Sequence, residues 1–237
     1  MSPTVVLIHG SFADASGWGG VITRLNAAGY TTLAPANPLR GVAADAAYVR
    51  SVLSTIEGPV VLVGHSYGGA VITNAAVGAD NVKALVYVAG FALDDGEAVG
   101  AATALGSDGP PPDLTQVLQF RPFGAGEGDV DAYLKVEIFH QVFCQDLPDD
   151  LAAVMAATQR PSALATLGEP SGPPAWKSVP AWYLVASSDR VIPPAAERVM
   201  GARAGATVVE IESSHVAMIS HPDEVTALIQ QAIDAVG

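Results

Sequence analysis

Cysteine, basic residues and long hydrophobic runs are all scarce in this chain of 237 residues. The single cysteine, Cys144, has no partner for an intrachain disulfide, which suits a reducing compartment. No apolar run is long enough to cross a bilayer, so we expect no membrane-spanning helix. No basic segment or cleavage site precedes the first apolar run, so we also expect no signal peptide and a cytoplasmic location.

The shortage of basic residues limits the partners that this chain can bind. Lys and Arg together number 11 against 24 Asp and Glu, a net charge of −13, which argues against nucleic acid or an anionic membrane as partner. No two histidines stand at ligand spacing with a carboxylate, so we predict no metal and no other cofactor. Half of the residues (50%) are hydrophobic, enough for one large core. Monomer and homodimer both remain open.

Short apolar runs alternate with helix-length segments along most of the chain. The runs are rich in β-branched residues and predict strands buried on both faces, at residues 5–8, 31–34, 60–63, 82–88, 181–186 and 207–211. The segments between and after them predict helices at 17–28, 44–56, 69–79, 193–204 and 222–236. This alternation predicts the α/β class, with a doubly wound, mostly parallel six-stranded sheet and helices on both faces.

The alternation breaks once, after the fourth predicted strand. Residues 92–175 are rich in Gly and Pro and contain two helix-like pieces, at 131–143 and 148–159. Insertions of this length in compact domains are usually functional, so we interpret this one as a cap, or lid. The predicted core is then made of residues 1–91 and 176–237.

The segment Gly64-His65-Ser66-Tyr67-Gly68 matches the pattern G-x-S-x-G between a predicted strand and a predicted helix. In so sharp a turn the residues two before and two after the serine must be small, and both are glycine. The helix N-terminus, with its free N–H groups, then points at the serine. A phosphate loop is the alternative, but no G-K-[ST] follows. We therefore predict that Ser66 is a nucleophile.

A serine hydroxyl needs a base to take its proton, and the base needs an acid to orient it. Of the five histidines, His215 follows the last predicted strand, at the sheet edge where Ser66 lies, and is the predicted base. We expect the others to be structural, solvent-exposed or pocket-lining: His9, His65, His140 and His221.

Two places offer the acid. Asp189 follows the fifth predicted strand in a short turn, whereas Asp94 and Asp95 follow the fourth strand in an exposed-looking acidic run. The chain order Ser, Asp, His fits both places. We favour Asp189, because its short turn leaves it at the strand tip.

An ester intermediate also needs hydrogen-bond donors and a binding pocket. The backbone N–H groups of Tyr67 and Ser11 are the predicted oxyanion hole, with Phe12 as second choice for the latter. Phe12 and the cap aromatics are the candidate pocket residues: Phe12, Phe120, Phe123, Phe139 and Phe143.

Together HG-x-F, GHSYGG, SSDRVIPP and SHVAM resemble the α/β-hydrolase superfamily, and more narrowly its branch of plant methyl-ester esterases, hydroxynitrile lyases and small bacterial esterases. The stretch FCQDLPDDLAAVMAATQRPSAL resembles that branch's cap. The resemblance implies a sheet in the order 2-1-3-4-5-6 and the same catalytic residues. This sequence departs from the lyases in one respect: their catalytic lysine directly follows the histidine, whereas Val216 follows His215 here.

These residues predict a cofactor-free serine carboxylesterase that hydrolyses small to medium apolar esters through an acyl-enzyme. Its partners would be the ester and water. The alternatives are other chemistry on the same scaffold, such as that of a lactonase, a perhydrolase or a hydroxynitrile lyase, and a ligand sensor with little turnover.

Overall fold

The computed structural model describes residues 2–109, 113–124 and 129–237, and is built around a parallel sheet of six strands. The strands are β1 (Thr4–Ile8), β2 (Thr31–Leu33), β3 (Val60–Ser66), β4 (Val82–Gly90), β8 (Ala181–Ala186) and β9 (Thr207–Ile211). They lie in the order β2-β1-β3-β4-β8-β9, and every neighbouring pair is parallel. The predicted α/β class and strand order are therefore confirmed.

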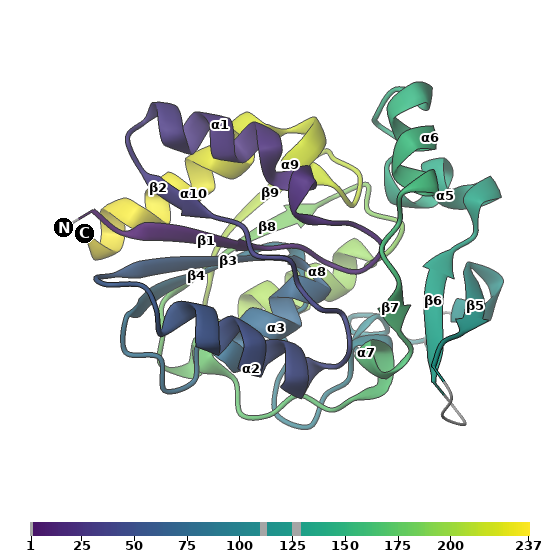
Figure 1. The fold of residues 1–237 in the computed structure, drawn as a ribbon, viewed down its shortest axis with the longest axis horizontal. Helices are drawn as coiled ribbons and strands as arrows, with labels where there is room; N and C mark the ends of the chain where they lie inside the picture. The colour runs from purple at the N-terminus through teal and green to yellow at the C-terminus, as the bar shows by residue number, and fades with distance from the viewer. Residues whose placement is uncertain (1, 110–112, 125–128) are drawn as a thin grey trace.

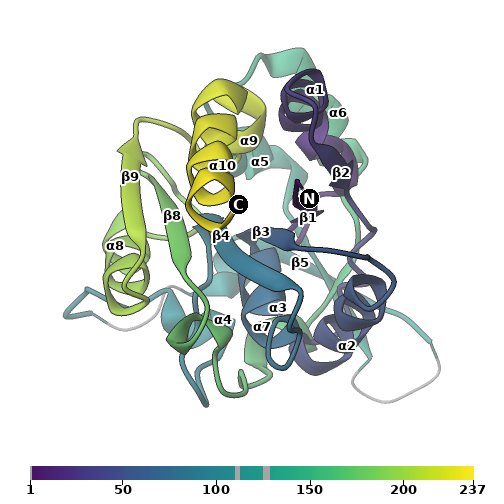
Figure 2. The same ribbon diagram turned by 90° about the vertical axis from the view of Figure 1, so that its left-hand side faces the viewer.

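Helices cover both faces of this sheet (Figures 1 and 2). On one face lie α1 (Gly19–Ala27) and α10 (Pro222–Val236), and on the other α2 (Val42–Leu53), α3 (Tyr67–Ala75) and α8 (Pro194–Arg203). Successive strand side chains point to opposite faces, so Val5 and Leu7 join one hydrophobic cluster while Val6 and Ile8 join the other. Both faces are thus covered, as a parallel sheet requires.

The insertion after β4 lies beyond the carboxyl ends of the sheet strands (Figure 1). It contains a small antiparallel sheet in the order β5-β6-β7, formed by β5 (Leu118–Pro122), β6 (Val130–Leu134) and β7 (Ser162–Ala163). Helices α5 (Val136–Phe143) and α6 (Asp149–Ala157) lie between β6 and β7 in the chain. Residues 110–112 and 125–128 of the predicted cap lie outside the described residues.

The helix predicted over residues 131–143 is wrong in its first half. Residues up to Leu134 form β6, which pairs with β5 so that Leu118 faces Leu134 and Phe120 faces Ala132. The helix begins only at Val136. Strand pairing, which depends on a partner distant in sequence, overrides the local helical pattern. The second predicted cap helix corresponds to α6.

The remaining elements are short. They are α4 (Val99–Ala102), α7 (Ala165–Gly168), α9 (Ala217–Ser220) and 3₁₀ turns at Ala15–Trp18, Leu114–Gln116 and Ala175–Lys177. Across the described ranges, no helix has the length and apolar character needed to span a bilayer.

Candidate active site

Ser66 occupies a strained turn between β3 and α3, with φ 53° and ψ −125°. Such a conformation is rare for a residue with a side chain and persists only where the surroundings impose it. A Cβ on Gly64 would lie 2.5 Å from the Gly68 carbonyl oxygen, and one on Gly10 would lie 2.6 Å from the Ser66 Cβ. Only glycine fits at these positions, so the backbone packs closely and holds the serine hydroxyl at the carboxyl edge of the sheet.

A row of hydrogen bonds joins three side chains from three different loops. Ser66 Oγ lies 2.8 Å from His215 Nε2, and His215 Nδ1 lies 2.5 Å from Asp189 Oδ2. The other carboxylate oxygen, Oδ1, accepts hydrogen bonds from the backbone N–H groups of Val191 (2.6 Å) and Ile192 (3.0 Å). With Nδ1–H donated to the carboxylate, Nε2 of a neutral imidazole is free to accept from the serine hydroxyl. The structure brings Ser66, His215 and Asp189 together as the sequence predicted.

The alternative acids lie elsewhere. Asp94 forms an ion pair of 2.6 Å with Lys177, whose hydrogen bond holds the pKa of that carboxyl below its usual range. Asp95 is exposed. Both nitrogens of His215 are already bonded to Ser66 and Asp189, so no nitrogen is left for either acid.

Two aromatic rings hold His215 in place. His65 is fully buried, its Nε2–H donates to the His215 carbonyl oxygen (2.8 Å), and its ring centroid lies 4.7 Å from that of His215. Burial lowers the pKa of His65 well below its ordinary value, so this ring stays neutral. The ring centroid of Phe143 lies 5.2 Å from that of His215. His65 therefore has the structural position expected for it.

The other three histidines are not part of this row. His9 Nδ1 lies 2.9 Å from the Gly10 carbonyl oxygen, and its Nε2 accepts from the Asn37 backbone N–H at 3.0 Å. His140 lies in α5, with Nε2 2.9 Å from the Leu147 carbonyl oxygen. His221 is partly exposed at the start of α10. Within the described residues, no group of three His, Cys, Asp or Glu side chains is arranged to hold a metal ion.

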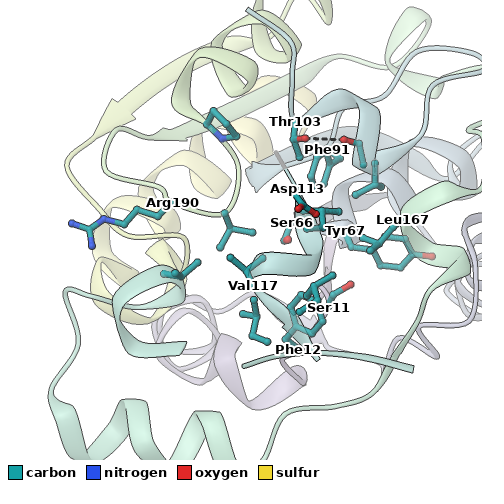
Figure 3. Close-up of a pocket in the computed structure, with 18 residues that line it drawn as sticks. Ser11, Phe12, Ser66, Tyr67, Phe91, Thr103, Asp113, Val117, Leu167 and Arg190 are labelled. Carbon is teal, nitrogen blue, oxygen red and sulfur yellow. Dashed lines mark hydrogen bonds between the residues drawn. The ribbon is translucent and has the colours of Figure 1, made fainter. Parts of the chain in front are cut away.

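A cavity of about 150 Å³ opens above Ser66 (Figure 3). Its floor includes the two predicted oxyanion residues, Ser11 and Tyr67, together with Phe12. The N–H groups of Ser11 and Tyr67 donate no hydrogen bond to any described residue. Aliphatic side chains make most of the remaining wall: Val99, Leu114, Val117, Leu118, Leu134, Val142, Leu167 and Val191.

Of the five aromatic residues predicted to line the pocket, the structure puts Phe12 there and the others elsewhere. Phe120 is 40% exposed on β5, and the ring of Phe123 lies under the Arg40 guanidinium at 4.9 Å. Phe139 and Phe143 are fully buried and pack against each other, with ring centroids 4.9 Å apart. The ring of Phe143 contacts His215 instead, and none of these four aromatic residues lines the cavity, whose walls are mostly aliphatic.

Sequence reasoning missed Glu197, a carboxyl buried in α8 beside the acid of the row. Glu197 is 0% exposed, and its Oε2 accepts a hydrogen bond of 2.9 Å from the Ala186 backbone N–H. Burial raises the pKa of Glu197 well above its ordinary value, and the nearby Asp189 carboxylate raises it further. Burial and the neighbouring carboxylate thus both favour the neutral, protonated form of Glu197. Glu197 lies in the first turn of α8, and the sequence around it gave no sign that its side chain would be buried.

We predict that Glu197→Gln stabilises the protein increasingly as the pH rises. The folded state keeps a proton that the unfolded chain releases above the ordinary value of 4.5, so the wild-type free energy of unfolding falls as pH rises from there toward the folded pKa. The slope is up to about 1.4 kcal/mol per pH unit. Glutamine has no such proton. Denaturant unfolding at several pH values should show that the free energy of unfolding of Glu197→Gln exceeds that of the wild type by more as the pH rises. Glu57→Gln, at an exposed position, is the control. A difference that does not depend on pH would contradict a neutral Glu197.

Comparison with known proteins agrees with the fold. The sequence pattern of the alpha/beta hydrolase family matches residues 5–228, and the chain belongs to this family. A pyrethroid hydrolase from Sphingobium wenxiniae is 26% identical over 98% of this chain and 88% of its own length. Two solved structures share the fold. Polyneuridine aldehyde esterase has a TM-score of 0.83 at 21% identity, covering 98% of this chain and 99% of its own. A methylesterase from Arabidopsis has a TM-score of 0.79 at 20% identity, with the same coverage.

Proposed function

We propose that this protein is a serine carboxylesterase that hydrolyses small to medium, largely apolar esters through an acyl-enzyme. One observation carries the proposal: the hydrogen-bonded row of Ser66, His215 and Asp189 ends at a cavity with mostly aliphatic walls. A nucleophile, a base and an orienting acid in this geometry are the requirements of acyl transfer.

In the proposed reaction, His215 Nε2 takes the hydroxyl proton while Ser66 Oγ attacks the ester carbonyl carbon. The N–H groups of Ser11 and Tyr67 stabilise the oxyanion, and Asp189 stabilises the imidazolium. His215 then donates its proton to the departing alcohol, leaving Ser66 acylated. Water then gives a proton to His215 as its oxygen attacks the acyl carbon. The bond to Ser66 Oγ breaks, the proton passes from His215 to Ser66 Oγ, and the carboxylic acid leaves.

Several features support ester hydrolysis over other chemistry on this scaffold. The proteins to which the chain is similar include a pyrethroid hydrolase, a methylesterase and polyneuridine aldehyde esterase. The residue after His215 is Val216, a fully buried aliphatic side chain. A leaving anion such as cyanide would have no fixed positive charge there to compensate its desolvation.

The three lysines and the cavity-lining Arg190 are engaged elsewhere. All three lysines donate to other groups: Lys83 to Asp80, Lys135 to Thr115 and Gln116, and Lys177 to Asp94. Arg190 lines the cavity, but it donates to the Gln141 carbonyl oxygen, and its guanidinium points away from Ser66 (Figure 3).

We therefore predict that the protein hydrolyses p-nitrophenyl acetate and releases no cyanide above the buffer blank from mandelonitrile or acetone cyanohydrin. Both reactions are measured on the same preparation, with Ser66→Ala as the control for background. Turnover of the aryl ester also separates an enzyme from a ligand sensor. Cyanide release that depends on Ser66 would contradict the assignment, as would an ester rate equal to that of Ser66→Ala.

A further inference from the structure

The cap is joined to the first oxyanion residue by a chain of three buried hydroxyl groups. Ser11 Oγ lies 2.9 Å from Ser162 Oγ, and Ser162 Oγ lies 3.0 Å from Thr166 Oγ1. Thr166 Oγ1 donates in turn to the Ala163 carbonyl oxygen at 2.7 Å. The three residues are 5%, 1% and 0% exposed, so water does not compete for these bonds.

Counting the hydroxyl hydrogens shows that this chain of hydrogen bonds runs in one direction, from donor to acceptor. Thr166 has one hydroxyl hydrogen and donates it to Ala163, so it can only accept from Ser162. Ser162 thereby uses its own hydrogen and can only accept from Ser11. Every hydroxyl from Ser11 onward donates toward the cap. The Ser11 side chain is thus anchored on β7 and α7.

A second chain of hydrogen bonds, buried at Tyr67 and Asp45 and partly exposed at Arg40, joins the cap to the other oxyanion residue. The Tyr67 hydroxyl donates to Asp45 Oδ2 at 2.7 Å, and this fully buried carboxylate also accepts from the backbone N–H of Arg40 (3.0 Å). The Arg40 guanidinium donates to Asp131 Oδ1 (2.9 Å) on β6 and to the Pro161 carbonyl oxygen (3.0 Å) beside β7. Burial and the Asp45 charge raise the pKa of Tyr67, so its hydroxyl keeps its proton.

Both chains end on the same piece of the cap. Asp131, the end of the Tyr67 chain, is the strand partner of Ala163, and Ala132 is the partner of Ser162. Strand β7 is also tied to the core, because the Ala163 backbone N–H donates to the Leu39 carbonyl oxygen at 2.9 Å. The two anchors are therefore adjacent positions of one small sheet.

We propose that the β6–β7 strand pair is the positioning element of the oxyanion hole, with Ser162, Thr166, Asp45, Arg40 and Asp131 as positioning residues. The inference rests on the proposed function. Ser11 and Tyr67 supply the N–H donors. The Ser11 side chain bonds directly to this strand pair, and the Tyr67 side chain reaches it through Asp45 and Arg40. Oxyanion donors stabilise the developing charge when they lie about 2.7–3.1 Å from it, and a small displacement weakens this bond, so a loosened anchor destabilises the transition state more than the bound substrate.

The test removes one buried hydroxyl without changing the shape of the side chain. Thr166→Val breaks the first chain, Thr166→Ser keeps its hydroxyl, and Thr158→Val is the matched control, because exposed Thr158 in the same cap donates only to its own helix. Aryl ester kinetics are measured per active site, counted by titration with an organophosphonate. The affinity for a trifluoromethyl ketone, which forms a tetrahedral oxyanion on Ser66, is measured in parallel.

We expect Thr166→Val to lower kcat about 10-fold with KM unchanged. The loss should be smaller than the roughly 10²–10³-fold fall in kcat that follows removal of an oxyanion donor, because here the donor is displaced and not removed. Ketone affinity should fall by the same factor. Thr166→Ser should restore both, and Thr158→Val should change neither. In a Ser11→Ala background, Thr166→Val should add less than about twofold, since the chain is already broken.

A merely structural role for Thr166 would reduce the titrated fraction of active protein while leaving kcat per site and ketone affinity intact, and that result overturns the inference. Full additivity with Ser11→Ala overturns it as well. Asp131→Ala tests the second chain by the same readouts, and also decides the matter if Thr166→Val does not fold. In each case, wild-type turnover that depends on Ser66 leaves the proposed function standing. If the wild type shows no such turnover, the proposed function and this inference are both overturned.

Discussion

Ser66→Ala is expected to lower kcat on aryl esters by about 10⁴-fold or more while the protein stays folded. The hydroxyl is the only group at the end of the hydrogen-bonded row that can form the acyl-enzyme, and His215 has no other donor at Nε2 among the described residues. Alanine also has a Cβ, so the strained backbone at φ 53° is no worse than in the wild type. Circular dichroism and the unfolding midpoint should therefore be nearly unchanged.

A labelling experiment makes this prediction specific to one atom. A serine-directed organophosphonate should attach once to the wild type, on the peptide that contains Ser66, and not to Ser66→Ala. Ser178→Ala, on the core surface and outside the cavity, is the control and should keep full labelling and full activity. Label on another serine, or near-normal turnover by Ser66→Ala, would mean that a different nucleophile acts.

The strained turn at Ser66, the base His215 and the acid Asp189 could be predicted from the sequence because their signals are local. Gly64 and Gly68 flank Ser66 within five residues, and the structure shows that a side chain at Gly64 would meet the Gly68 carbonyl oxygen. Asp189 lies just after the buried strand β8, and His215 lies just after the edge strand β9. Parallel strands bring their carboxyl ends to one edge of the sheet, so strand order alone was enough to predict their meeting.

The cap is different because its structure depends on pairing between segments far apart in the chain. Residue Leu134 belongs to a strand only because β5 lies beside it, and the helical spacing of its neighbours gave no sign of this. The same dependence explains why Phe139 and Phe143 turned inward. An aromatic residue in a cap has no local signal that says which way its ring will face.

The buried polar partners were missed for a related reason. Ser162 and Thr166 stand 151 and 155 positions after Ser11. Only the folded structure reveals that the three hydroxyl groups are linked by hydrogen bonds. Glu197 sits in a helix without a clear amphipathic pattern, yet its carboxyl is completely buried. Polar residues of this kind stand in ordinary sequence positions. Their roles come from contacts that only the fold creates, between core and cap for Ser162 and Thr166, and with Ala186 and Asp189 of the core for Glu197.

Asp189→Asn is expected to lower kcat by about 10⁴-fold, through the tautomer of His215. Asp189 Oδ1 accepts from the backbone N–H groups of Val191 and Ile192, so the asparagine oxygen should keep that place. Its NH₂ group then faces His215 Nδ1 and needs an acceptor there. The imidazole would carry its proton on Nε2 instead, and Nε2 could no longer take the proton of Ser66.

Asp94→Asn is the matched control, because it makes the same change on the acid that pairs with Lys177 at the protein surface. It should change kcat by less than about twofold, as for surface substitutions that leave the catalytic groups in place. Aryl ester kinetics of both variants, with circular dichroism to verify folding, give the ranking. If Asp94→Asn loses activity and Asp189→Asn keeps it, the acid belongs to the loop after β4, and the hydrogen bond between His215 and Asp189 has no catalytic role.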